Sequence, residues 1–208
     1  MAFTFFFRDG MVLDAAAEIL VRETMGRSRV RVWNAGCAMG PETFSFLMML
    51  SERMGKFAFE TVTVDATDYE EHGDFGSVVR AGRYPFDMLS RIPRELFERY
   101  FDAASDETGH YDVSDRLKRR VRFIHHDLLD GSTPGYGYAM VICKNVLLHF
   151  NERQRLEVLG TFHDSLDERG VLVMEHTQKL PTELDDRFEK VLPDLQIFRK
   201  RSAVVAQV

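Results

Sequence analysis

Two glycines and an acidic side chain lie close together after an apolar segment near residue 36. Gly36 and Gly40 stand in a turn that follows residues 30–35, and Glu42 comes two residues after the second glycine. Glycine lets the backbone approach a nucleotide-like ligand, because it carries no Cβ atom. Glu42, in the first turn of a following helix, can accept hydrogen bonds from ribose hydroxyls. Ordinary tight turns also use glycine, so this motif gains weight only from the rest of the chain.

Polar residues also follow the next three apolar segments that we predict as strands. Asp68 ends the second strand, Asp127 follows the third and Asn145 follows the fourth. The carboxyl ends of parallel strands meet at one edge of a sheet, where ligands bind. Asp68 is placed to hold a pair of ribose hydroxyls, and Asp127 to accept from an adenine amino group while Leu128 covers the base. A single acid would be read as a helix N-cap, but polar or glycine-rich elements at four successive strand ends favour a ligand site.

The identity of the ligand follows from the motifs that the chain lacks. No third glycine follows Gly40 in the register of a dinucleotide-binding turn, and no Gly-Lys-Ser/Thr sequence occurs. His125 and His126 are adjacent on a predicted strand and would point to opposite faces, so we expect no metal site. S-adenosylmethionine (SAM) is the best candidate, because it needs ribose and adenine contacts but no pyrophosphate cradle.

Alternating helices and strands must position these residues. Apolar spacing predicts helices over 12–25, 42–54 and 152–166, with short helices in 70–101, and strands over 30–35, 59–66, 121–125, 138–143 and 170–175. Residues 102–120 predict a small β excursion, and 196–200 with 203–207 predict a terminal hairpin. Strands separated by helices need right-handed crossovers, so we expect an α/β fold with a mostly parallel sheet.

The composition limits the class of protein. A chain of 208 residues with 45% hydrophobic residues fits one globular domain, and a net charge of −6 argues against a nucleic-acid partner. The basic run at 116–120 is interpreted as a solvated edge. No apolar run is long enough for a membrane span, and the start of the chain lacks a signal pattern. Cys37 and Cys143 are expected to be buried, reduced thiols, which favours a cytoplasmic protein.

These motifs occur in an order that resembles the catalytic domain of the CheR-type methyltransferases, which methylate chemoreceptor glutamates. The first family motif resembles Trp-Asn-Ala-Gly-Cys-Ala-Met-Gly-Pro-Glu-Thr-Phe-Ser at 33–45. Further matches are Thr-Phe-Phe-Phe-Arg at 4–8, Ala-Thr-Asp at 66–68, Gly-Arg-Tyr at 82–84, Arg-Tyr-Phe at 99–101, Asp-Leu-Leu at 127–129 and Cys-Lys-Asn-Val-Leu-Leu-His-Phe at 143–150. The matches cover nearly the whole chain.

The resemblance implies a fold and a set of site residues. The fold is a Rossmann-like class I methyltransferase domain over 1–208, with a mostly parallel seven-stranded sheet, a C-terminal antiparallel hairpin and a small β-subdomain insert at about 102–124. The implied cofactor is SAM, with S-adenosylhomocysteine (SAH) as product. The implied cofactor-binding residues are Thr4, Arg8, Gly36, Gly40, Glu42, Asp68, Asp127, Leu128 and Asn145. Arg8 is expected near the methyl donor and the incoming substrate, and it and His149 are the candidate catalytic residues.

Several positions depart from the family pattern. The family's Tyr is His149, its Arg is Lys144, its first Glu is Pro41, and its later Gly-His-Ser-Glu reads Glu-His-Thr-Gln at 175–178. The family's helical N-terminal domain finds no match here, so we expect either a naturally minimal or a trimmed protein. The leading expectation is methyl transfer to a glutamate of a receptor-like protein. The alternatives are another protein site or a small molecule as acceptor, with His149 as base rather than a structural residue, or a non-catalytic module that binds SAM or SAH.

Overall fold

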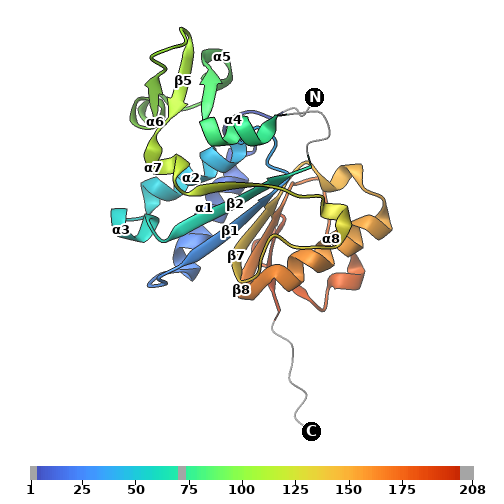
Figure 1. Cartoon of the computed structure of the whole chain (residues 1–208). Helices are drawn as coiled ribbons and strands as arrows, with labels where there is room; N and C mark the ends of the chain where they lie inside the picture. Colours follow the sequence, from blue (N-terminus) through green and yellow to red (C-terminus); the bar gives the residue numbers. More distant parts are fainter. Residues whose placement is uncertain (1–3, 70–73, 202–208) are drawn as a thin grey trace.

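The computed structural model describes residues 4–69 and 74–201. A seven-stranded sheet forms its centre, with helices on both faces and a small second sheet above one end (Figure 1). This arrangement confirms the predicted α/β fold.

The strand order of the main sheet is β6-β2-β1-β7-β8-β10-β9. The strands are β1 (Val30–Ala35), β2 (Val62–Asp68), β6 (Val121–His125), β7 (Tyr138–Cys143), β8 (Leu166–Met174), β9 (Phe188–Lys190) and β10 (Ile197–Lys200). The first five strands of this order run parallel, and β10 runs antiparallel to both of its neighbours. The chain moves outward from β1 to β2 and later returns to place β7 on the other side of β1. The carboxyl ends of β1 and β7 therefore form the topological switch point, where ligands bind in such sheets.

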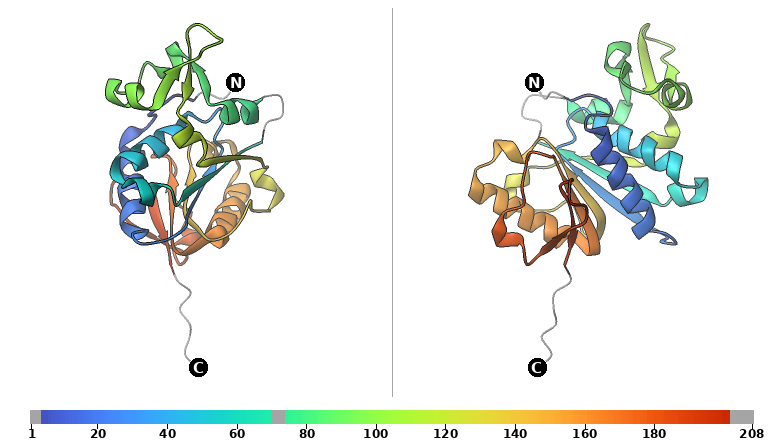
Figure 2. Two further views of the ribbon diagram at one scale, coloured as in Figure 1. Left: turned by 60° about the vertical axis from the view of Figure 1, so that its left-hand side comes forward. Right: turned by 180° about the vertical axis from the view of Figure 1, so that it is seen from behind.

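Helices bury the sheet on both faces, which explains why the central strands are apolar almost throughout. One face is covered by α1 (Gly10–Glu23) and α2 (Pro41–Arg53), and the other by α8 (Glu152–Ser165) (Figure 2). Neighbouring residues of β1 enter different cores: Val32 packs with the first two helices, and Trp33 packs with α8. The shorter helices are α3 (Lys56–Phe59), α4 (Phe75–Ala81), η1 (Leu128–Asp130), η2 (Leu147–His149) and η3 (Thr182–Leu184). No helix in the described ranges is long and apolar enough to cross a membrane.

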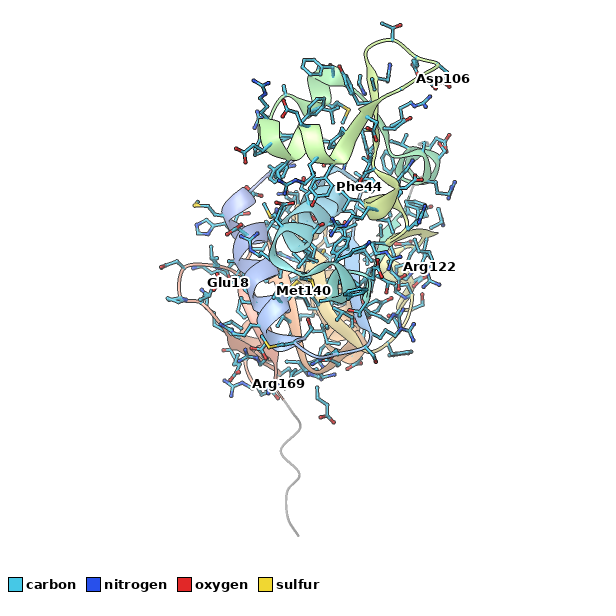
Figure 3. All side chains as sticks on the ribbon, turned by 90° about the vertical axis from the view of Figure 1, so that its left-hand side faces the viewer. Glu18, Phe44, Asp106, Arg122, Met140 and Arg169 are labelled. Atoms are coloured by element: carbon cyan, nitrogen blue, oxygen red, sulfur yellow. The ribbon has the colours of Figure 1, made fainter. Side chains whose placement is uncertain are left out.

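The small sheet consists of β3 (Arg83–Pro85), β4 (Phe101–Ala103) and β5 (His110–Val113), in the antiparallel order β3-β5-β4. Helices α5 (Phe86–Leu89) and α6 (Arg94–Tyr100) lie between β3 and β4 in the chain. Helix α7 (Asp115–Lys118) follows β5 and leads back to the main sheet. Figure 3 shows Phe44 of α2 beneath this sheet and Asp106 at its far tip.

The boundaries of this insert differ from the predicted 102–124. The small sheet begins at Arg83, while Val121–His125 belongs to the main sheet. Strand β3 has only three residues and forms through pairing with β5 across more than twenty residues, so no local periodicity marks it.

The structure confirms a C-terminal antiparallel hairpin, which pairs Phe188–Lys190 with Ile197–Lys200. The predicted second strand, 203–207, lies outside the described residues. The upstream strand is short and reads Phe-Glu-Lys, which gives a weak strand signal. Three other elements shift by a few residues: α1 begins at Gly10, β2 begins at Val62 because the preceding residues form α3, and β8 begins at Leu166.

Candidate functional site

A cavity of about 650 Å³ opens at the carboxyl ends of the parallel strands. It is lined by Thr4, Arg8, Gly36, Cys37, Ala38, Glu42, Asp68, Tyr69, His126, Asp127, Leu128, Leu129, Lys144, Asn145, Val146, Leu148, His149 and Phe150. All of the predicted site residues except Gly40 are among them. The structure therefore brings together residues from the start of the chain to position 150, and it places them at the switch point.

The turn after β1 forms one wall of the cavity. The backbone N–H groups of Gly36 and Cys37 both donate to Thr67 O, at 2.8 and 2.9 Å. Gly36 has a φ of +79°, and a Cβ atom there would overlap the Val146 side chain. Only glycine meets both demands without strain, and the neighbour that requires it is a protein side chain, so the predicted approach to a ligand stays a prediction.

Asp68 fixes the same turn from the end of β2. Its Oδ2 accepts a hydrogen bond of 2.7 Å from the N–H of Ala38, whose φ is +47°. A non-glycine residue in this left-handed region needs such support from its surroundings. Asp68 therefore shapes the wall as well as lining the cavity.

Gly40 does not line the cavity, so the structure adds no support to its predicted role in cofactor binding. It precedes α2 with a φ of +92°, and a Cβ atom there would lie 3.1 Å from both Tyr84 Oη and Val79 Cγ2. Tyr84, on β3, donates its hydroxyl to Met39 O at 2.6 Å. The second glycine thus lets the small sheet pack closely on the turn, a role that local sequence does not distinguish from ligand contact.

Glu42 lies in the first turn of α2 and accepts from two buried side chains. Asn34 Nδ2 donates to Glu42 Oε1 at 2.8 Å, and Lys144 Nζ donates to Glu42 Oε2 at 3.0 Å. The Lys144 side chain is fully buried, and sequence reasoning noted it only as a departure from the family's Arg. A signal in the sequence could have indicated that Lys144 belongs to the site. Lys144 directly follows a buried strand and stands beside the predicted site residue Asn145.

The segment after β6 supplies the apolar part of the cavity. Asp127 Oδ1 caps η1 by accepting from the N–H of Leu129 at 2.9 Å, and Leu128 is buried against the cavity. His126 also lines the cavity and lies edge-on to Trp33. Burial lowers the pKa of His126 below its usual value, against the opposing effect of Asp130 and Asp127, so its imidazole is neutral near pH 7.

The segment after β7 closes the opposite wall. Asn145 has a φ of +60°, and its N–H donates to Glu175 Oε2 at 3.0 Å. Burial raises the pKa of Glu175, whose Oε1 has no hydrogen-bond partner within residues 4–69 and 74–201. His149 is exposed where this wall meets solvent. Burial raises the pKa of the Cys143 thiol well above its usual value, so this cysteine is an inert core residue.

The N-terminal segment, residues 4–9, contributes Thr4 and Arg8 to the lining of the cavity. Phe6 is fully buried, with its ring 5.0 Å from the Tyr84 ring and 5.7 Å from the Phe101 ring. The N–H of Phe7 donates to Ser45 Oγ at 2.9 Å. The aromatic residues therefore anchor the segment that carries Arg8.

This strand order, with a final antiparallel pair and a glycine turn facing an acid after the second strand, defines the class of Rossmann-like SAM-dependent methyltransferase folds. A solved structure of the class is magnesium protoporphyrin IX methyltransferase (ChlM) from Synechocystis PCC 6803 with bound SAH. It superimposes with a TM-score of 0.50 at 16% identity, covering 93% of this chain and 84% of that one, which supports the fold alone.

The family is defined by sequence. The model of the CheR methyltransferase SAM-binding domain matches residues 2–196, so the chain belongs to this family and its cofactor is SAM. Chemotaxis protein methyltransferase 1 of Pseudomonas aeruginosa is 29% identical over 90% of this chain and 69% of its own length. The chemotaxis protein methyltransferase of Borreliella burgdorferi is 27% identical over 85% of this chain. The chain spans 64% of the length of the latter protein.

The residues present fit SAM. Leu128 offers an apolar surface for a base, and Asp68 and Asp127 bring carboxylate oxygens to the same cavity. Gly36 keeps the wall free of a side chain where the turn faces Val146. Within the described ranges, no group of three or more His, Cys, Asp or Glu side chains is placed to hold a metal ion.

Proposed function

We propose that this protein transfers a methyl group from SAM to the carboxylate of a glutamate on a receptor-like protein, a proposal supported by its family and by its similarity to chemotaxis protein methyltransferases. The observation that carries the proposal is that Arg8, a fixed cation, lines the same cavity as the acidic residues suited to the cofactor. We also propose a cytoplasmic location, which the two free, buried cysteines support.

The proposed roles divide the cavity into two parts. Glu42 and Asp68 would hold the polar groups of the cofactor, with Asp68 at the ribose hydroxyls, and Asp127 and Leu128 would hold the adenine. When bound, SAM supplies a methyl group on a sulfonium, which a nucleophile displaces in line. Asn145 would form the wall near that methyl group, and Thr4 would lie with Arg8 at the mouth of the pocket.

Arg8 would orient the acceptor. A guanidinium presents a planar fork of donors that matches a carboxylate, so it can align one oxygen for attack. A glutamate side chain has a pKa of about 4.3 and is already ionised at neutral pH, so no general base is needed. The chain's contribution would then be alignment and the exclusion of water.

The test combines binding and transfer. Calorimetric titration with SAM and SAH should give micromolar affinity, and Asp68→Ala should weaken it at least about tenfold because a buried hydrogen-bond partner is lost. Arg8→Ala should keep the affinity for SAH but lose transfer of labelled methyl groups to receptor fragments. Unchanged transfer in Arg8→Ala would refute the role of Arg8, and no binding by folded protein would refute the enzyme.

A second candidate is a methyltransferase for another protein site or a small molecule. It is favoured by His149, an exposed imidazole at the cavity that could accept a proton from a hydroxyl or amine. His149→Tyr should then abolish transfer to that acceptor, whereas transfer to a carboxylate would survive. Tight binding of SAH without transfer to any acceptor pool would instead support a non-catalytic binding module.

A further inference from the structure

Lys144 is a buried cation whose contacts all come from the protein. Its side chain is fully buried, and its Nζ lies 3.0 Å from Glu42 Oε2 and 3.3 Å from Asp9 Oδ2. The same Nζ donates to the backbone oxygen of Arg8 at 3.3 Å. Of the three N–H donors of this ammonium, two are used in hydrogen bonds to Glu42 and to the Arg8 oxygen, and Asp9 adds an ion pair. The two carboxylates compensate the cost of burying the charge.

Two of the three acceptors belong to the N-terminal segment, whose backbone is unusual. Phe7 and Asp9 both have left-handed conformations, with φ values of 57° and 51°. Non-glycine residues adopt this region only where surrounding contacts hold them there. Phe6 and the Phe7 N–H anchor the first half of the segment, and Lys144 contacts the second half, at Arg8 and Asp9.

We infer that Lys144 is a positioning residue, which clamps the N-terminal segment to α2 and thereby fixes Arg8 at the cavity. Although Lys144 lines the cavity, both of its hydrogen bonds and its ion pairs hold protein groups, so we assign it to positioning rather than to cofactor binding. The consequence for catalysis rests on the function proposed above. The clamp itself does not.

The decisive variant is Lys144→Met, which keeps the length of the side chain and removes its charge. Hydrogen exchange of the amides in residues 4–9 should become faster, while exchange in α2 stays slow. Because a displacement of about 1 Å costs on the order of 100-fold in rate, kcat for methyl transfer should fall by about that factor. The dissociation constant for SAH should change by a smaller factor than kcat, because Lys144 would reach the cofactor only through Glu42, whereas it contacts the Arg8 backbone directly.

Two further variants make the result specific. Lys144→Arg keeps the charge and should restore both slow exchange and transfer. Lys118→Met changes a lysine of α7 that is paired with Asp115 at 3.2 Å and does not line the cavity, and it should change neither. If Lys144→Met fails to fold because Glu42 is left unpaired, the double variant with Glu42→Gln removes the unpaired charge and is used for the exchange measurement.

Unchanged exchange in residues 4–9 of Lys144→Met would overturn the inference. So would a loss of SAH affinity as large as the loss of kcat, because Lys144 would then be a cofactor ligand. The exchange measurement needs no methyl acceptor, so it decides the clamp even if the wild-type protein methylates nothing.

Discussion

At the scale of single residues, Gly36 is the most constrained position of the cavity wall. A Cβ atom there would overlap Val146, and the residue holds a φ of +79°. Gly36→Ala should therefore lower the free energy of unfolding by about 1–3 kcal/mol through overpacking and strain, and weaken SAH binding. Urea unfolding and calorimetry measure both effects. Gly160→Ala in α8 is the control: no described atom lies within 4 Å of the added Cβ, and the change should stabilise by about 0.5–1 kcal/mol.

Glu175 gives a second residue-scale prediction, on pH dependence. Burial raises its pKa above the ordinary value of 4.5, so between these two values the folded protein binds more protons than the unfolded chain. The stability contribution of this carboxyl is present below pH 4.5 and is lost as the pH rises through the raised pKa.

Glu175→Gln removes this titration and keeps an oxygen for the N–H of Asn145. The stability gain of the variant over the wild type should be larger at pH 8 than at pH 4, by about 1.4 kcal/mol for each unit of the shift. Urea unfolding at both pH values measures the gain. An equal difference in stability at the two values would contradict the prediction.

At the scale of elements, Asp65 joins four neighbouring strands. It lies on β2 and accepts from Arg31 on β1 at 2.7 Å, from Tyr138 on β7 at 2.7 Å and from Arg122 on β6 at 2.9 Å. Burial alone raises the pKa of Asp65, but the hydrogen bonds, that from Arg122 first, outweigh it and lower the pKa. Its contribution to stability is therefore present above its ordinary pKa of 3.8 and is lost as the pH falls through the lowered value.

Asp65→Asn should lower the free energy of unfolding at pH 7 by about 1.5–3 kcal/mol, because the buried Tyr138 hydroxyl and the half-buried Arg31 lose a charged acceptor, whereas the exposed Arg122 can bind water. The loss should shrink as the pH falls below 3.8 through the lowered pKa of the wild-type carboxyl, and urea titration at several pH values measures it. Asp186→Asn, at an exposed position, serves as the control and should change stability by less than about 0.5 kcal/mol. A loss that does not depend on pH would contradict the electrostatic origin.

At the scale of the whole molecule, Tyr84 connects the small sheet to the turn at residues 36–40 and to the N-terminal segment. Its side chain is buried, its hydroxyl donates to Met39 O, and its ring contacts Phe6. Tyr84→Phe should weaken SAH binding by about fivefold, equivalent to one net hydrogen bond of about 1 kcal/mol. Calorimetry measures the change, and Tyr136→Phe at an exposed ring is the control. Equal affinity would show that the small sheet does not support the turn.

The main sheet could be predicted because its strands carry a strong local signal. Val30–Ala35 and Tyr138–Cys143 are mostly apolar, rich in β-branched or large residues, and mostly buried, so the prediction and the structure agree on their bounds. β3 and β9 could not be predicted, since each has three residues and exists through pairing with a distant strand.

The sequence by itself determined the fold class and most of the cavity wall. Gly36, Asp68, Asp127 and Asn145 follow four parallel strands, and the geometry of such a sheet brings its carboxyl ends to one edge. Only the tertiary structure separated Gly40 from the cavity and gave Lys144 its partners. Lys144 lies 136 positions from Arg8 and 102 from Glu42. Contacts of this range depend on how loops and helices pack over the sheet, and no local spacing in the chain encodes that packing.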